Sequence, residues 1–183
     1  MMQRFHGLVL AALCAVGAVL PLAAQADSKA EIDANVRVAL EEFYEKSPAG
    51  RILAEDAAGI LVFPKVLKAG IGVGGEYGEG ALLVGGQPVA YYSTAAASIG
   101  FQFGAQVKSQ VVLFMTQQAL DRFRDSDGWE AGVDGSVALI EFVAAEEISS
   151  NSIQDPIIGF IFSNRGFMYN LTFEGSKMTE ISR

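Results

Sequence analysis

The spacing of hydrophobic residues divides the chain into a helical part and an extended part. Over residues 30–46 apolar side chains recur every three or four positions, which predicts an amphipathic helix. Its apolar stripe consists of Ile32, Val36, Ala39 and Phe43. Ser47 and Pro48 then supply the N-cap and first-position proline that begin a helix. A second, short helix is therefore expected to run to about Asp56.

The rest of the chain alternates with a period of two or forms short apolar runs, which predicts strands. Strands are expected at residues 59–66, 69–77, 81–84, 89–93, 98–108, 110–115, 157–163, 167–173 and 177–181, with extended structure over 129–142. Turns are expected at residues 78–80 and 164–166, and a helix capped by Thr116 should run to about Arg124. These elements predict an α+β fold in which N-terminal helices pack on a strongly curved, mostly antiparallel, barrel-like sheet of many short strands.

Glycines are concentrated in residues 57–80, which form the most distinctive stretch of the chain. Gly70, Gly72 and Gly74 fall on one face of a predicted strand, so that face has almost no side chains. Glycine weakens a strand unless another backbone, a helix or a ligand approaches closely. Two interpretations follow: tight packing in a bent sheet, or a surface that holds a ligand.

Residues 1–26 have the anatomy of a secretory signal peptide. Arg4 precedes an apolar run that is too short to span a bilayer, and Ala24-Gln25-Ala26 satisfies the small-x-small rule for cleavage. We therefore expect an exported, most simply periplasmic, protein that begins at Asp27 and forms one domain over residues 27–183, with helices over 27–56 and a glycine-rich sheet over 57–183. Leu13 directly precedes Cys14 and the apolar run continues past it, which argues against lipid anchoring through Cys14.

Composition excludes several classes of function. The formal net charge is −8, a value unfavourable for binding nucleic acid. The single cysteine, Cys14, and the single histidine, His6, both lie in the predicted signal peptide. The exported chain would therefore lack a cysteine or histidine nucleophile–base pair and the usual zinc ligands. We expect a protein that is not an enzyme and that holds no metal ion or cofactor.

Other motifs in the chain fit ordinary structure better than chemistry. Gly70-x-Gly72-x-x-Gly75 matches a dinucleotide-binding string, but no βαβ pattern surrounds it. Glu76 and Glu79 could form the carboxylate pair of a glycosidase. They flank the predicted glycine turn, however, where exposed acidic side chains are common. We therefore interpret both as solvated.

A few cations stand at the predicted strand ends and turns of this acidic chain. They are Lys65, Lys68, Lys108, Arg165 and Lys177. If the fold gathers some of them, they would form a binding site for lipid phosphate, with Lys65 and Lys68 beside the glycine strand as the leading pair. The alternative is ordinary charge that keeps the surface soluble and protects sheet edges.

Several motifs, in a consistent order, resemble the SYLF domain. They are Gly59-Ile60-Leu61-Val62-Phe63-Pro64, the glycine ladder from Lys68 to Gly80, Ser98-Ile99-Gly100-Phe101-Gln102-Phe103-Gly104, and the tail from Gly159 through Gly175-Ser176-Lys177. The resemblance extends from about Ala30 to the end of the chain. It departs from the family in the acidic face of the first helix and in Tyr92-Ser93, where a tryptophan–serine pair is typical.

The resemblance implies a lipid-binding module. Eukaryotic members of the family bind phosphoinositides, partly through an N-terminal amphipathic helix, and some bind actin; exported bacterial members are generally described as lipid-binding. The expected partner is therefore a phospholipid or a membrane surface, whereas actin is not accessible to a protein exported from a bacterium. A structural or protein-interaction module of the cell envelope, without a specific lipid ligand, is the alternative.

Overall fold

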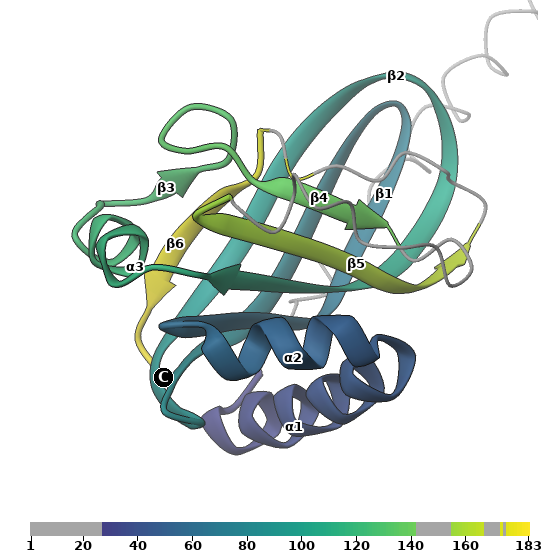
Figure 1. Cartoon of the computed structure of the whole chain (residues 1–183). Coiled ribbons are helices and arrows are strands. Elements are labelled where there is room, and N and C mark those ends of the chain that lie inside the picture. Colours follow the sequence, from purple (N-terminus) through teal and green to yellow (C-terminus); the bar gives the residue numbers. More distant parts are fainter. Residues whose placement is uncertain (1–26, 142–154, 167–172, 174) are drawn as a thin grey trace, which may run out of the picture.

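The structure, a computed structural model, describes residues 27–141, 155–166, 173 and 175–183. Its elements are α1 (Lys29–Lys46), α2 (Pro48–Asp56), β1 (Gly59–Val84), β2 (Gln87–Phe114), α3 (Gln117–Arg124), β3 (Trp129–Glu130), β4 (Ala138–Glu141), β5 (Ile157–Gly166) and β6 (Lys177–Ile181). Helices α1 and α2 lie side by side against a strongly curved sheet, and α3 lies at one end of that sheet (Figure 1). The predicted α+β class is confirmed.

The three helices begin where the sequence predicts. The side chain of Ser28 accepts a hydrogen bond from the amide of Glu31, and the carboxylate of Glu31 accepts one from the amide of Ser28, which forms a capping box at the start of α1. Ser47 caps α2 through the amide of Gly50, and Thr116 caps α3 through the amide of Ala119. Each cap satisfies an amide that has no partner inside its helix.

Strands β1 and β2 form one long antiparallel hairpin in place of the separate short strands that were predicted. Pairing runs from Gly59 opposite Phe114 to Val84 opposite Gln87, and Gly85 and Gly86 close the hairpin with positive φ angles of 58° and 76°. Pro64 does not end the strand, because an irregularity in the pairing between Phe63 and Val66 accommodates it. The turn predicted at residues 78–80 is also wrong, since these residues continue β1.

The hairpin bends through an arch near its middle, where the register shifts between Ile71 and Val73 (Figure 1). Glycines permit the bend because backbone meets backbone there. A Cβ atom on Gly70 would overlap the Cα of Gly74, and one on Gly80 would overlap the carbonyl oxygen of Val62. A Cβ atom on Gly78 would lie 2.7 Å from the carbonyl oxygen of Lys65. Tight packing in a bent sheet therefore accounts for these three glycines.

Strand β2 organises the rest of the sheet. Its first half pairs with β6 and its second half with β5, both antiparallel, and the strand order is β3-β6-β2-β5-β4 with β1 on the other edge of β2. The pairing of β4 with β5 is parallel. Strand β5 runs through Asn164, Arg165 and Gly166, so the hairpin loop predicted there is wrong. The strand predicted at residues 167–173 falls almost entirely outside the described residues.

Two apolar cores lie on opposite faces of the curved sheet. The concave side, which we call the interior, is filled by residues such as Phe63, Val112 and Phe114 together with Leu120 and Phe123 from α3. The outer face is covered by the predicted stripe of α1. Its Phe43 ring packs edge-on against Phe160, with 4.9 Å between ring centroids. Among the described residues, none of the helices is long and apolar enough to cross a membrane.

Candidate functional site

The interior of the sheet changes from apolar to polar along β2. Phe114 and Val112 belong to the interior core, and Gln110 and Lys108 follow on the same face toward the arch. Gln110 is completely buried, and Lys108 is 1% exposed. We call the buried polar residues at this end the interior polar cluster. They are Lys68, Glu76, Thr94, Gln106, Lys108, Gln110 and Ser176.

An ion pair lies at the centre of the interior polar cluster. Lys108 Nζ is 3.0 Å from Glu76 Oε2, and the two side chains are 0% and 5% exposed. Ser176 Oγ donates a longer hydrogen bond of 3.4 Å to Glu76 Oε1. Burial lowers the pKa of the Lys108 ammonium and the nearby charge of Lys68 lowers it further, whereas Glu76 acts in the opposite direction. The charge of Glu76 is therefore already balanced inside the protein.

Lys68 is the second buried cation of the cluster. It lies two residues along β1 from Val66, which pairs with Lys108, so the two lysines are neighbours on the interior face. Lys68 is only 4% exposed. Within the described part of the chain its ammonium group has no carboxylate partner, and the cluster contains two cations for one anion.

Two neutral members of the cluster also have unused hydrogen-bonding capacity. Both side chains are fully buried. Among the described residues, the amide nitrogen and oxygen of Gln110 have no hydrogen-bond partner, and the hydroxyl of Thr94 has none either. Buried polar groups are almost always hydrogen-bonded. The interior end near the arch thus combines an excess of positive charge with unused donors and acceptors.

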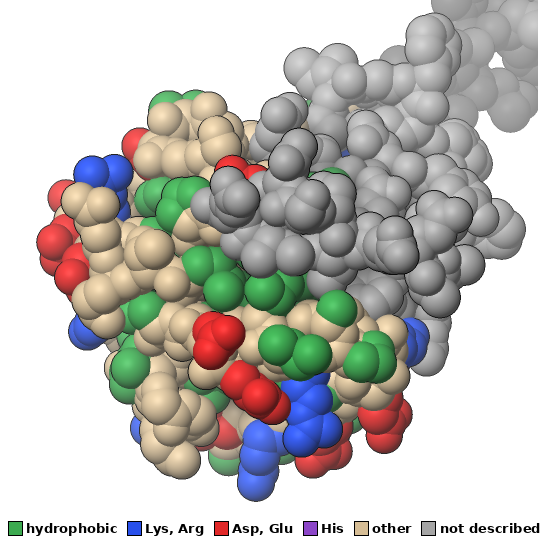
Figure 2. Space-filling model, viewed as in Figure 1, with side chains coloured by type: hydrophobic (Ala, Val, Ile, Leu, Met, Phe, Trp, Pro, Cys, Tyr) green, Lys and Arg blue, Asp and Glu red, His purple; other side chains and the backbone are tan. Residues whose placement is uncertain are grey.

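The five predicted cations do not form one cluster. Lys68 and Lys108 come together inside the sheet, while Lys65 and Lys177 are exposed on the outside. The backbone of Arg165 pairs with Val107, but its side chain lies outside the described residues. On the face that carries α2, basic and acidic side chains are interspersed (Figure 2). The expected pairing of Lys65 with Lys68 is wrong, because these residues fall on opposite sides of β1.

The outer side of the arch is apolar, and none of the helices in the described part of the chain covers it. We call this surface the hairpin face; it consists of the exposed residues Leu67, Ala69, Val73, Gly75, Tyr77, Ala95, Ala97 and Ala105. Leu67, Val73 and Tyr77 are 47%, 67% and 50% exposed. The register joins the two strands across this face, since Ala69 pairs with Ala105 and Tyr77 with Ala95. None of its members is charged.

Exposed cations stand at two margins of the hairpin face. Lys65 precedes Leu67 by two residues on β1, so its exposed side chain lies on the same face of the strand as Leu67. Lys177 pairs with Ala95, so its side chain emerges beside that residue. The side chain of Lys177 also lies along Gly128, where an added Cβ would be 2.7 Å from Lys177 Cε.

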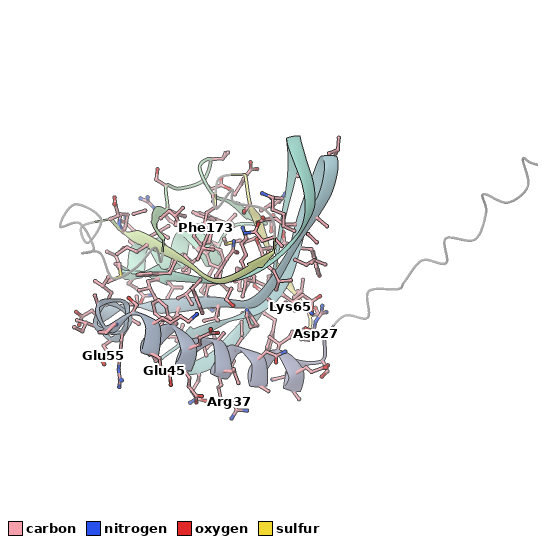
Figure 3. The ribbon with its side chains drawn as sticks, turned by 90° about the vertical axis from the view of Figure 1, so that its right-hand side faces the viewer. Asp27, Arg37, Glu45, Glu55, Lys65 and Phe173 are labelled. Atoms are coloured by element: carbon pink, nitrogen blue, oxygen red, sulfur yellow. The ribbon has the colours of Figure 1, made fainter. Side chains whose placement is uncertain are left out.

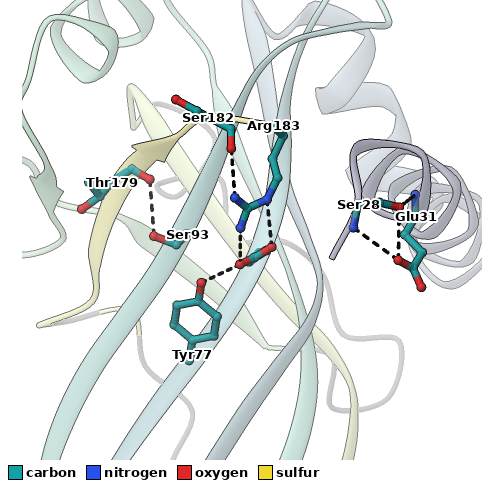
Figure 4. A network of polar contacts seen from close by, with 8 residues as sticks. Ser28, Glu31, Tyr77, Ser93, Thr179, Ser182 and Arg183 are labelled. Carbon is teal, nitrogen blue, oxygen red and sulfur yellow. Dashed lines mark hydrogen bonds and ion pairs between the residues drawn. The ribbon is translucent and has the colours of Figure 1, made fainter. Parts of the chain in front are cut away.

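A second buried carboxylate, Glu79, accepts hydrogen bonds from Tyr77 and Arg183, both of which Figure 4 labels. Arg183 donates to both of its oxygens, with Nη2 2.5 Å from Oε1 and Nε 3.3 Å from Oε2. The hydroxyl of Tyr77 donates to Oε1 at 2.6 Å. Burial alone would raise the pKa of Glu79, but the hydrogen bonds from Arg183 and Tyr77 outweigh it and hold the pKa below its usual range.

Sequence reasoning therefore missed the two acidic residues that organise the polar contacts. Glu76 and Glu79 are 8% and 9% exposed, and their interpretation as solvated turn residues is wrong because β1 does not turn there. Two glutamates three positions apart, next to glycines, do not indicate from the sequence alone which residues their side chains contact. Lys108, the partner of Glu76, lies on β2 and is brought close by the bend of the hairpin, whereas Arg183, the partner of Glu79, lies beyond the end of β6.

The described residues do not present a metal site. No group of three or more histidine, cysteine, aspartate or glutamate side chains in that part of the chain could hold a metal ion. A pocket of about 140 Å³ lies beside α3, lined by residues that include Arg122, Trp129 and Asp134. It is smaller than the 300–1,000 Å³ or so of typical small-molecule sites.

Comparison with known proteins identifies one family. Residues 95–183 match the family model described as "Ysc84: Las17-binding protein actin regulator". The matched stretch begins in the first half of β2 and contains α3 and β3 to β6, including Lys108, Gln110 and Lys177. No curated protein matches the chain.

Proposed function

Because residues 95–183 make the chain a member of the Ysc84 (SYLF) family, we propose that it is an exported, non-catalytic domain that binds phospholipid at a membrane surface. The observation that carries this proposal is the hairpin face with Lys65 and Lys177 at its margins. An apolar surface bordered by cations suits the boundary between acyl chains and anionic headgroups. The chain as a whole has a net charge of −8. The hairpin face differs from the rest of this acidic protein, because none of its described side chains is acidic.

The properties of α1 favour membrane docking through the arch over docking through the helix. The apolar stripe of α1 is buried, with Ile32, Val36 and Phe43 each at most 1% exposed. Its outward face carries acidic groups, and Glu45 points away from the body of the molecule in Figure 3. A helix that lies in a membrane interface usually presents lysine and arginine instead.

Vesicle sedimentation tests the proposal directly. The purified protein is mixed with phosphatidylcholine vesicles, or with vesicles that also contain phosphatidylglycerol, at low and physiological salt. We expect binding that needs the anionic lipid and weakens with salt. Lys65→Glu/Lys177→Glu and Leu67→Ser/Val73→Ser should each reduce it. Arg37→Glu on α1 and Val133→Ser, whose valine is 73% exposed elsewhere, are matched controls that should leave it intact.

A protein partner is the second candidate, favoured by the same hairpin face. A contiguous apolar surface can meet another protein as well as a lipid, and the outward cations are dispersed. If neither vesicle type binds the protein, phospholipid binding at the surface is refuted and the envelope interaction module takes its place. Export is tested separately: mass spectrometry of protein recovered from the periplasm should show a chain that begins at Asp27.

A further inference from the structure

The interior polar cluster has an unbalanced positive charge. Lys108 and Glu76 neutralise each other at 3.0 Å, which leaves Lys68, at 4% exposure, as the second buried ammonium. Moving a lone ammonium from water into a protein interior is unfavourable, because the charge loses its hydration. An anion beside Lys68 would offset that cost.

Unused hydrogen-bonding groups accompany this charge. Gln110 faces the same interior as Lys108, two residues further along β2, and its amide has no partner among the described residues. Thr94 enters the same interior from the first half of β2, where it pairs with Gly78 and Met178. An amide group and a hydroxyl can each donate one hydrogen bond to an oxyanion.

We propose that Lys68 binds a phosphate group inside the curved sheet, with Gln110 and Thr94 as neutral hydrogen-bond donors. The proposal rests on the proposed phospholipid binding and names the part of the lipid that the interior takes. A lysine ammonium binds phosphate as a point charge and lacks the planar fork with which arginine grips a carboxylate. The tetrahedral phosphate can accept hydrogen bonds from several directions at once, which fits donors that project from different segments.

Lys108 has a different role in this arrangement. Its ammonium is bound to Glu76, so it neutralises the carboxylate that would otherwise repel the phosphate. It is therefore a positioning residue, and Lys68 is the residue that contacts the ligand. The cluster lies at the arch end of the interior, next to Leu67 and Ala69 of the hairpin face, so the surface and interior sites share one end of the molecule.

The test uses water-soluble ligands, so that it does not depend on membrane docking. Inorganic phosphate and a short-chain phosphatidic acid below its critical micelle concentration are titrated into the protein while the side-chain signals of ¹³C-labelled lysines are followed by NMR. We expect the Lys68 signal to shift on saturation, and Lys68→Met to weaken binding by about tenfold or more, equivalent to about 1.4 kcal/mol. Lys65→Met, which removes an exposed cation three residues away, should change it less than twofold. Lys68→Arg, which keeps the charge, shows whether the fold tolerates replacement at this position.

The outcomes separate this proposal from the proposed function. Saturation by phosphatidic acid but not by inorganic phosphate identifies a lipid phosphate as the ligand, and equal binding of both identifies a general phosphate site. If wild-type protein sediments with anionic vesicles but no soluble ligand shifts the Lys68 signal, the interior site is wrong and surface binding stands. If no vesicle binds but Lys68-dependent phosphate binding is seen, the interior site stands and surface binding is wrong.

Discussion

Lys108 Nζ lies 3.0 Å from Glu76 Oε2 across the interior of the bent hairpin. The two residues are not partners in the β ladder, because Glu76 pairs with Ala96 and Lys108 pairs with Val66. Their contact therefore joins the halves of β1 and β2 on either side of the arch. A salt bridge with both side chains almost completely buried tolerates the loss of one partner poorly, since the other is left as an unpaired buried charge.

We accordingly expect Glu76→Gln and Lys108→Met each to lower the free energy of unfolding by about 3–5 kcal/mol. The double variant Glu76→Gln/Lys108→Met should be less destabilised than the sum of the two single variants, because it leaves no unpaired charge. Denaturant unfolding of the four proteins measures the coupling. Additive effects would show that the contact does not join the halves of the hairpin energetically.

The contact between Arg183 and Glu79 predicts a dependence on acid pH. The pKa of Glu79 is lower in the folded protein than its ordinary value of 4.5, so the folded state binds this proton less tightly than the unfolded state. The stability contributed by the ionised carboxylate is complete above pH 4.5 and is lost as the pH falls through the lowered pKa. Arg183→Gln and Glu79→Gln should therefore lower the melting temperature at pH 7.

The melting temperatures of these two variants should approach that of the wild type as the pH falls below 4.5. Thermal melts followed by circular dichroism over this pH range provide the measurement. Arg51→Gln, which removes an exposed ion pair with Glu55 on α2, is the control and should have little effect at any pH. A deficit for Glu79→Gln that is the same at acid and neutral pH would contradict the assignment.

The glycines of β1 predict a contrast between two substitutions. Gly80→Ala would place a methyl group onto the carbonyl oxygen of Val62, and overpacking of this kind usually costs about 1–3 kcal/mol. Gly75→Ala would meet its nearest neighbour, the Ala96 carbonyl oxygen, at 3.5 Å, an ordinary contact. It should be neutral, or stabilising by up to about 1 kcal/mol through the entropy of the unfolded chain. Chemical denaturation compares the two, and equal effects would argue against the close approach in the arch.

Local patterns were sufficient for the helices of this fold and insufficient for its long strands. Each helix has a cap of its own, Ser28, Ser47 or Thr116, and a cap depends on residues that are close in sequence. The ends of strands depend on the partner strand. Pro64 and the glycines at 78 and 80 are turn formers by local chemistry, but pairing with β2 carries the chain through all three positions.

The same distinction explains what could be predicted of the candidate site. The lysines were visible as rare cations in an acidic chain, and the alternation in β1 and β2 was visible as well. The sequence did not reveal that Lys65 and Lys68 lie on opposite sides of β1, because the irregularity at Pro64 and Lys65 changes which residues face inward. The role of Glu76 depends on its contact with Lys108, which is 32 positions away in the sequence. No local sequence pattern predicts that contact.

Three tyrosines predict the behaviour of the protein at alkaline pH. The hydroxyls of Tyr77, Tyr91 and Tyr92 donate to the carboxylates of Glu79, Asp33 and Glu180 at 2.6, 2.8 and 3.4 Å. Burial, together with these carboxylates, raises the pKa of each phenol from 10.0 to about 12. A phenol must keep its proton to donate, so the folded state holds these protons more tightly than the unfolded state.

Stability from these phenols is therefore complete below pH 10 and is lost as the pH rises from 10 to about 12. The lowered pKa of Lys108 acts in the opposite direction, but its contribution is complete by its ordinary value of 10.5. Phenolate absorbance, recorded alongside circular dichroism, should show Tyr77, Tyr91 and Tyr92 ionising only as the protein unfolds above pH 10. Tyr91→Phe and Tyr92→Phe should each remove one late-titrating group. Ionisation of every tyrosine near pH 10 in a protein that stays folded would mean that these phenols do not donate to the carboxylates.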